Sequence, residues 1–216
     1  MKLINKTVSL TQRVLIYGPP KSGKTQLAGA LAEHYNLIWF DLENGYATLT
    51  KLPSAYQDRI ELISIPDSRV FPIAVETLLK VINGAECKIC EAHGKVACPA
   101  APCKEAYTRV CLNEISSDTI VVFDSLTQFS NSCISHITKN QADDYKLDYA
   151  DWGQLAVLVD KFLSQVQVAR YNVVCITHEA EVEMEDGKSK LVPVCGSTKS
   201  SRNTAKYFDN VVYEEL

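Results

Sequence analysis

The segment from residue 18 to residue 25 carries the pattern with the clearest chemistry. It reads GPPKSGKT and fits G-x-x-x-x-G-K-[ST], the Walker A pattern of a phosphate-binding loop. The backbone N–H groups of such a loop, together with the N-terminus of the helix that follows, bind phosphate oxygens. The predicted nucleotide-binding residues of this loop are Gly18, Pro19, Pro20, Lys21, Ser22, Gly23, Lys24, Thr25 and Gln26.

Two residues of this loop have distinct chemical roles. The Lys24 ammonium can reach the outer phosphates of a nucleotide, and the Thr25 hydroxyl can bind Mg²⁺. Gly18 and Gly23 permit a backbone geometry that a side chain would obstruct. A chance glycine turn before a helix is the alternative, and it does not account for the agreement of strand, spacing and fixed residues.

Acidic residues that follow predicted strands are the candidate magnesium and water-activating groups. Asp124 ends the apolar run TIVVF and can hold Mg²⁺ through water, although Asp124 or the adjacent Ser125 could instead cap a helix. Glu43 follows the run that begins at residue 37, so it is the candidate base or acceptor for an attacking water molecule. Asp41 is the rival for that role, and a solvated loop position is the structural alternative for Glu43.

His178 follows a third apolar run, NVVCIT, which occupies residues 172–177. At that position the imidazole could lie near the γ-phosphate and act as a nucleotide sensor and third catalytic residue. A packed or surface histidine is the alternative.

Cysteines cluster between residues 85 and 113 with the spacing C-x2-C-x7-C-x4-C. Thiolates bind Zn²⁺ tetrahedrally, and a short loop without its own apolar core is stabilised by closing around one ion. The predicted zinc ligands are Cys87, Cys90, Cys98 and Cys103. Cys111 or His93 could replace one of them, and unliganded thiols or a redox pair are the alternatives to a zinc site.

The elements that must position these residues follow from the apolar pattern. Apolar runs predict strands at 14–17, 37–40, 119–123, 172–177 and 210–213, and helical spacing predicts helices at 24–34, 71–82, 151–170 and 200–207. The run TIVVF is typical of a strand that is buried on both faces of a parallel sheet. Asp151 is the expected N-cap of the longest helix. The predicted class is α/β, with a mostly parallel sheet flanked by helices.

Composition excludes several other classes of protein. The 216 residues are 46% hydrophobic and 22% charged, which argues against a disordered, collagenous or coiled-coil chain. The net charge of −4 argues against coating of nucleic acid by bulk electrostatics. No apolar run approaches the ~20 residues that cross a bilayer, so no membrane partner is expected.

The ordered set of motifs resembles the RecA-type recombination ATPases and, more closely, their core-only phage relatives that act as single-strand annealing proteins. The resemblance rests on GPPKSGKT, WFDLENGYATL, IVVFDSLTQF, and ITHE followed by GSTKSSRNTAKYFDNVVY. It implies a RecA-like P-loop ATPase domain over residues 1–216, interrupted by a zinc-hairpin insertion at 85–113. The implied cofactors are ATP, Mg²⁺ and Zn²⁺.

The same resemblance implies roles for individual residues. Lys24 and Thr25 match the nucleotide and Mg²⁺ residues, Glu43 matches the catalytic glutamate, and Asp124 matches the aspartate of the second nucleotide motif. Better-known members have a glutamine where this chain has His178. The additional domains of the larger recombinases are also lacking, so annealing or strand binding is expected rather than strand exchange.

Basic residues gather near the end of the sequence. The stretch 187–208 contains five basic residues and no acidic ones: Lys188, Lys190, Lys199, Arg202 and Lys206. Such a stretch could bind a DNA backbone with an affinity that weakens with salt, whereas a solvated loop and helix face is the alternative. One of the last three could instead reach the γ-phosphate of a neighbouring subunit, which would require an oligomer.

The expected function is that of an ATP-dependent single-stranded DNA-binding ATPase in phage-type recombination or single-strand annealing. A homo-oligomer is expected, with a single-strand-binding protein as a further candidate partner, in the cytoplasm or in a host's cytoplasm for a phage protein. A nucleotide-switched adaptor or loader ATPase is the alternative. A small-molecule P-loop kinase is disfavoured because only two arginines, Arg170 and Arg202, follow Asp124.

Overall fold

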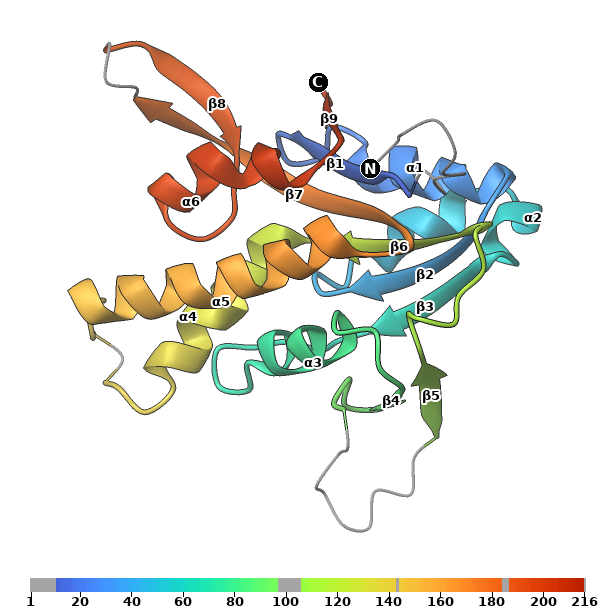
Figure 1. The fold of residues 1–216 in the computed structure, drawn as a ribbon, viewed down its shortest axis with the longest axis horizontal. Helices are drawn as coiled ribbons and strands as arrows, with labels where there is room; N and C mark the ends of the chain where they lie inside the picture. Colours follow the sequence, from blue (N-terminus) through green and yellow to red (C-terminus); the bar gives the residue numbers. More distant parts are fainter. Residues whose placement is uncertain (1–10, 97–105, 143, 184–186, 216) are drawn as a thin grey trace, which may run out of the picture.

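A seven-stranded sheet with helices on both faces forms the body of the protein (Figure 1). The computed structural model describes residues 11–96, 106–142, 144–183 and 187–215. The strands of this sheet are β1 (Arg13–Gly18), β2 (Asn36–Asp41), β3 (Ile60–Ser64), β6 (Thr119–Asp124), β7 (Asn172–Glu183), β8 (Ser189–Pro193) and β9 (Asn210–Tyr213). The α-helices are α1 (Lys24–Gly29), α2 (Ser54–Gln57), α3 (Ile73–Val81), α4 (Leu126–Thr138), α5 (Tyr149–Val168) and α6 (Thr198–Asn203). Short 3₁₀ helices are η2 (Ala30–Glu33), η3 (Tyr46–Lys51) and η4 (Thr204–Tyr207).

The order of the strands brings the motifs to one edge of the sheet. The strands run in the order β3-β2-β6-β7-β1-β9, and all neighbours in this order are parallel. The carboxyl ends of β1, β2, β6 and β7 therefore meet at the same edge, where open α/β sheets bind ligands. The predicted mostly parallel sheet with flanking helices is confirmed.

Apolar residues on alternate positions of the strands build two cores, one on each face of the sheet. Trp39 of β2 and Val122 of β6 face the core beneath α1 and η3. Phe40 and Phe123, the next residues along the same strands, face the core beneath α3, α4 and α5, where their rings stack with centroids 5.2 Å apart. Burial on both faces explains why these strands read as continuous apolar runs.

The start of α5 differs from the prediction. Asp148, not Asp151, is the N-cap: its side chain accepts from the Asp151 backbone N–H, and the Asp151 side chain accepts from the Asp148 backbone N–H. This reciprocal pair is a capping box, in which the acidic residue at the third helical position also satisfies a backbone donor. The helix therefore begins at Tyr149. Among the described residues, no helix is both long and apolar enough to cross a membrane.

Two hairpins project from the sheet. The outer half of β7 pairs antiparallel with β8 beyond the edge of the sheet (Figure 1). Within residues 85–113, which the sequence predicts as an insertion, β4 (Cys87–Cys90) pairs antiparallel with β5 (Tyr107–Val110) as a separate two-stranded sheet. Ile89 and Val110 of this second hairpin are buried in the core beneath α3.

Candidate nucleotide-binding site

The predicted phosphate-binding loop lies between the end of β1 and the start of α1. A Cβ atom placed on Gly18 would lie 2.0 Å from the backbone oxygen of Glu214, so a side chain does not fit there. Gly23 has a φ of +103°, in the left-handed region that favours glycine. Both glycines that the motif fixes are thus required by the backbone of this chain.

The Lys24 ammonium folds back over the loop. Its Nζ donates to the backbone oxygens of Gly18 at 3.1 Å and Pro19 at 2.6 Å, and to the Ser22 Oγ at 3.4 Å. Burial lowers the pKa of Lys24, and the negative charge of Asp124 opposes that shift. Because charged phosphate oxygens are stronger acceptors than neutral carbonyls, a bound nucleotide would attract this ammonium.

Thr25 and Asp124 meet where a magnesium ion is expected. The Thr25 Oγ1 donates to the Asp124 Oδ2 at 3.0 Å. Burial, followed by the charges of Glu43 and Asp41, raises the pKa of Asp124 to about 7. A nearby cation would offset this accumulation of carboxylates, and hydroxyl and carboxylate oxygens are ligands that Mg²⁺ prefers. These residues therefore fit Mg²⁺, which when bound would neutralise charge on the phosphates.

Glu43 is held by partners from two other strands. The Ser125 Oγ donates a short hydrogen bond to Oε1, and the His178 Nε2 lies 3.7 Å from Oε2. Burial acts to raise the pKa of Glu43, but hydrogen bonds from His178 and Ser125 outweigh it, and the pKa lies below its usual value. Glu43 is therefore an ionised, oriented acceptor at neutral pH.

Asp41, the rival of Glu43, has a structural role. It is fully buried and accepts hydrogen bonds from the backbone N–H groups of Glu43 and Gly45 at 3.1 Å and of Tyr46 at 3.2 Å. These bonds fix the turn that carries Glu43 from β2 into η3. Asp41 does not line the cavity described next, so Glu43 is the better candidate for the water-activating group.

His178 lies beside the loop because of the register between β7 and β1, which pairs it with Gly18. Its backbone N–H donates to the Thr127 Oγ1 at 3.0 Å. Its Nδ1 is buried without a hydrogen-bond partner among the described residues. The predicted loop residues, Glu43, Asp124 and His178 thus converge, as their positions at the ends of parallel strands predict.

A cavity of about 370 Å³ lies among these groups. It is lined by the loop residues Lys21 and Gly23 to Gln26, and by Glu43, Asp124 and His178. Thr48 and Lys51 of η3 also line it, although sequence analysis identified neither. No motif marks these two positions; only the packing of η3 beside α1 brings them to the cavity.

Comparison with known families identifies this arrangement. Residues 10–216 match a family described as an AAA domain. The chain belongs to this family. As a member of the AAA domain family it has a P-loop ATPase fold, and the family implies binding of ATP and Mg²⁺, in agreement with the cavity above.

This AAA domain has only low similarity to the following solved structure. A solved structure of a prototypical ATPase from the type III secretion system of pathogenic bacteria is similar at 10% identity and a TM-score of 0.44. The match covers 90% of this chain and 62% of that chain, so this chain spans about three fifths of the length of the secretion ATPase. No curated protein matches the sequence.

The five basic residues predicted to contact DNA lie on or next to three elements of the AAA domain. Lys190 is on β8 and Lys188 just precedes it, whereas the other three lie on α6 and η4. The Arg202 guanidinium donates to the backbone oxygen of Glu183, and the Lys206 ammonium lies 4.7 Å from the ring centroid of Tyr207. The Arg202 and Lys206 side chains therefore already have contacts within the chain.

An acidic strand lies beside the basic residues of β8. The outer half of β7 places Glu179, Glu181 and Glu183 on one face, since alternate residues of a strand share a face. Lys190 pairs with Val182 on the opposite face. The glutamates of β7 therefore share a face of the hairpin with Ser189, Leu191 and Pro193, and Lys190 lies on the other face.

The predicted zinc ligands are only partly described, because Cys98 and Cys103 lie outside the described residues. Cys87 and Cys90 occupy the two ends of β4, and the alternation of a strand directs their side chains to opposite faces. The Cys90 Sγ lies 3.3 Å from the His93 Nδ1. Among the residues that the structure describes, no group of three or more His, Cys, Asp or Glu side chains could hold a metal ion.

Proposed function

We propose that this AAA domain hydrolyses ATP and binds single-stranded DNA, in phage-type recombination or single-strand annealing. In the proposed reaction Glu43 accepts a hydrogen bond from a water molecule and orients it toward the γ-phosphate. Lys24 binds the outer phosphates, and Thr25 and Asp124 hold Mg²⁺. Ser125 and His178 keep the Glu43 carboxylate in place through the contacts described above.

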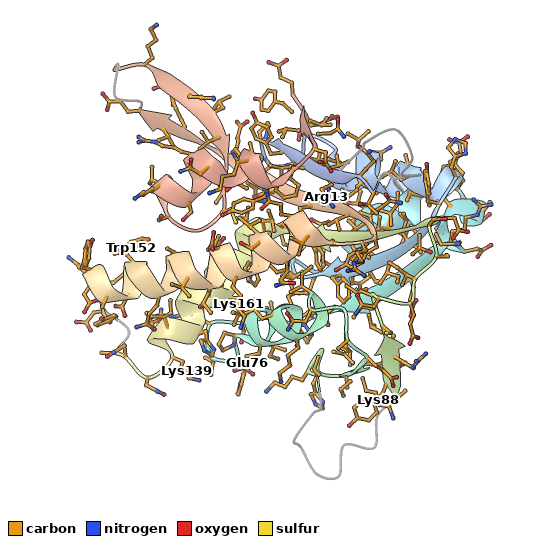
Figure 2. The ribbon with its side chains drawn as sticks, viewed as in Figure 1. Arg13, Glu76, Lys88, Lys139, Trp152 and Lys161 are labelled. Atoms are coloured by element: carbon orange, nitrogen blue, oxygen red, sulfur yellow. The ribbon has the colours of Figure 1, made fainter. Side chains whose placement is uncertain are left out.

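A basic and aromatic groove is the observation that supports DNA as the partner. The groove has a volume of about 530 Å³ and lies where α4 ends and α5 begins. Arg69 and Lys146 line it together with Tyr145 and Trp152. Figure 2 shows Trp152 at the outer end of α5. Cations that bind phosphates beside aromatic rings that stack on bases are typical of single-strand binding surfaces.

The aromatic side chains of this groove are available to a ligand. Trp152 is 43% exposed, and the neighbouring Tyr149 is 94% exposed. The Tyr145 hydroxyl donates to the Asp151 Oδ2 at 2.5 Å, which fixes its ring at the wall of the groove. Because Asp148 and Asp151 are occupied by the capping box, their carboxylates are already satisfied within the chain.

Helix α4 joins the groove to the nucleotide site. Its N-cap is Ser125, which accepts from the Gln128 backbone N–H and donates to Glu43. Its second half supplies Asn131, Ile134 and Ser135 to the groove, about 9 to 15 Å along the helix from the cap at 1.5 Å rise per residue. A shift of Glu43 on binding ATP would therefore act directly on the start of α4, which supports nucleotide-dependent DNA affinity.

Removal of the two cations of the groove tests the location of DNA. We expect the double variant Arg69→Ala/Lys146→Ala to bind a labelled oligonucleotide roughly 10-fold more weakly, because each lost phosphate contact removes counterion release and an ion pair. The slope of affinity against salt concentration should also fall. Fluorescence anisotropy at several salt concentrations measures both quantities.

The matched control removes two cations from α6 and η4, as Lys199→Ala/Lys206→Ala. Retained affinity in this control, with loss in the groove variant, supports the groove. The reverse result would place DNA on the basic residues predicted from the sequence and would contradict the groove. Unchanged ATP binding in both variants establishes that the nucleotide site is intact.

A structural zinc ion in the insertion is a second part of the proposal. The contact between Cys90 and His93 favours these two as ligands, with Cys98 and Cys103 following in the sequence. Cys87 is less suitable, because the alternation of β4 directs its side chain to the face opposite Cys90, into the core beneath α3.

Metal content after substitution tests this ligand set. We expect the purified protein to contain one zinc per chain, and Cys90→Ser or His93→Ala to reduce it severalfold, because each removes a ligand from a four-coordinate site. Cys87→Ser is the matched control and should retain zinc. Loss of zinc in Cys87→Ser with retention in His93→Ala would restore the ligand set predicted from the sequence, and a metal-free protein would exclude the site.

A further inference from the structure

We infer that Lys51 binds the terminal phosphate of ATP, as a second cation opposite Lys24. It lies 27 positions after Lys24 in the sequence and belongs to no phosphate-binding motif. The cavity of the nucleotide site is nevertheless lined by Lys21 and Lys24 from the loop and by Lys51 from η3. The inference rests on ATP as the ligand of this cavity and is independent of DNA binding.

The segment that carries Lys51 is fixed at its beginning by Asp41. The three backbone hydrogen bonds to the buried Asp41 carboxylate span Glu43 to Tyr46, and η3 starts at Tyr46. Glu43 and Lys51 therefore belong to one anchored segment. This segment therefore supplies both a cation, Lys51, and the candidate water-activating carboxylate to the lining of the cavity.

The end of the same segment is fixed by close packing on α1. Leu49 and Leu52 are buried in the core beneath the phosphate loop. A Cβ atom placed on Gly29 would lie 2.7 Å from the Leu52 Cδ1 and 3.0 Å from the Leu49 Cδ2. The absence of a side chain on Gly29 thus allows η3 to approach α1 closely enough for Lys51 and Thr48 to line the cavity.

Charge explains what a second lysine would do. The cavity contains the carboxylates of Glu43 and Asp124, which repel a triphosphate. Lys51 is exposed and has no ion pair with another described residue, so its ammonium is available to a ligand. The γ-phosphate carries charge on three oxygens, and a second cation in the cavity would stabilise that charge as the bond to the leaving group breaks.

Comparison of ATP and ADP affinities tests this role. We expect Lys51→Met to weaken binding of a slowly hydrolysed ATP analogue roughly 10-fold or more, the usual effect of a lost charged hydrogen bond, and to leave ADP affinity within about 2-fold. Lys51→Arg should restore most of the ATP affinity. Lys161→Met, which removes an exposed lysine from α5 (Figure 2), is the control for a general loss of charge.

Each outcome of this experiment decides the inference. Selective loss of ATP affinity with an unchanged melting temperature supports it. Equal weakening of ATP and ADP, or no weakening, would overturn it and place Lys51 at the inner phosphates or outside the ligand. If the unsubstituted protein bound neither ATP nor ADP, the proposal that ATP is the ligand of this cavity would be wrong. That result is distinct from one in which only the role of Lys51 is wrong.

Discussion

The Lys24→Ala variant is expected to lose tight ATP binding, with affinity falling roughly 100-fold because one ammonium donates to more than one phosphate oxygen. In the structure this ammonium is buried and its acceptors are neutral backbone oxygens of its own loop. Among the described residues no other lysine or arginine is buried, so its removal leaves Asp124 without a buried cation nearby. Isothermal titration calorimetry with ATP and Mg²⁺ measures the loss.

The loop itself should remain folded in this variant, because Gly18 and Gly23 determine its backbone. Lys161→Ala is the control, since it removes an exposed lysine of α5 that does not line the nucleotide cavity (Figure 2). Normal ATP affinity in Lys24→Ala would contradict the assignment of residues 18–25 as the phosphate-binding loop.

The Glu43→Gln variant is expected to bind ATP normally and to hydrolyse it about 100-fold or more slowly. The amide keeps the size of the side chain and an oxygen that can accept from Ser125, but it has no charge with which to polarise water. The lowered pKa of the Glu43 carboxyl, which follows from its hydrogen bonds to His178 and Ser125, means that the charged form is lost only under acidic conditions. Steady-state phosphate release measures turnover.

An exposed carboxylate provides the matched control for Glu43. Glu61→Gln lies on β3, outside the cavity, and should leave turnover unchanged. Unchanged turnover in Glu43→Gln would show that Glu43 does not activate the water molecule and would favour Asp41 in that role.

Elements that are buried on both faces are the ones that the sequence predicted well. The runs at 119–123 and 172–177 are apolar because each faces both cores, and each became a central strand of the sheet. Parallel strands align their carboxyl ends, so Asp124 and His178 follow these runs into the nucleotide site. The positions of the phosphate loop and Glu43 follow from the same geometry.

Elements that depend on tertiary packing were missed. Helix α4 reads LTQFSNSCISHIT, in which serine, threonine and asparagine obscure the apolar spacing, and it is held by burial of Leu126, Phe129 and Cys133. Strand β3 is an edge strand with Leu62 40% exposed, so its apolar pattern is weak. Asp151 was wrongly predicted as the N-cap of α5, because both members of this capping box are of a residue type that favours the N-cap position.

Contacts between segments that are distant in the sequence explain the remaining differences between the predicted and the observed candidate site. The stretch from residue 187 appears purely basic in the sequence, but its pairing with β7 forms a hairpin whose other face carries the glutamates at 179, 181 and 183. Lys51 reaches the cavity through the packing of η3 against Gly29, which no local pattern records. The Cys90–His93 contact depends on the tight turn after β4, in which the Gly94 N–H donates to the Cys90 oxygen at 2.7 Å.

We expect ATP binding and single-stranded DNA binding to be coupled in this protein. The most direct test is anisotropy of a labelled single-stranded oligonucleotide titrated with the protein, with and without Mg²⁺ and a slowly hydrolysed ATP analogue, at two salt concentrations. The account predicts salt-sensitive binding that tightens when the analogue is present. A protein that binds ATP but binds no DNA in any state would contradict the account and favour a nucleotide-switched adaptor or a kinase.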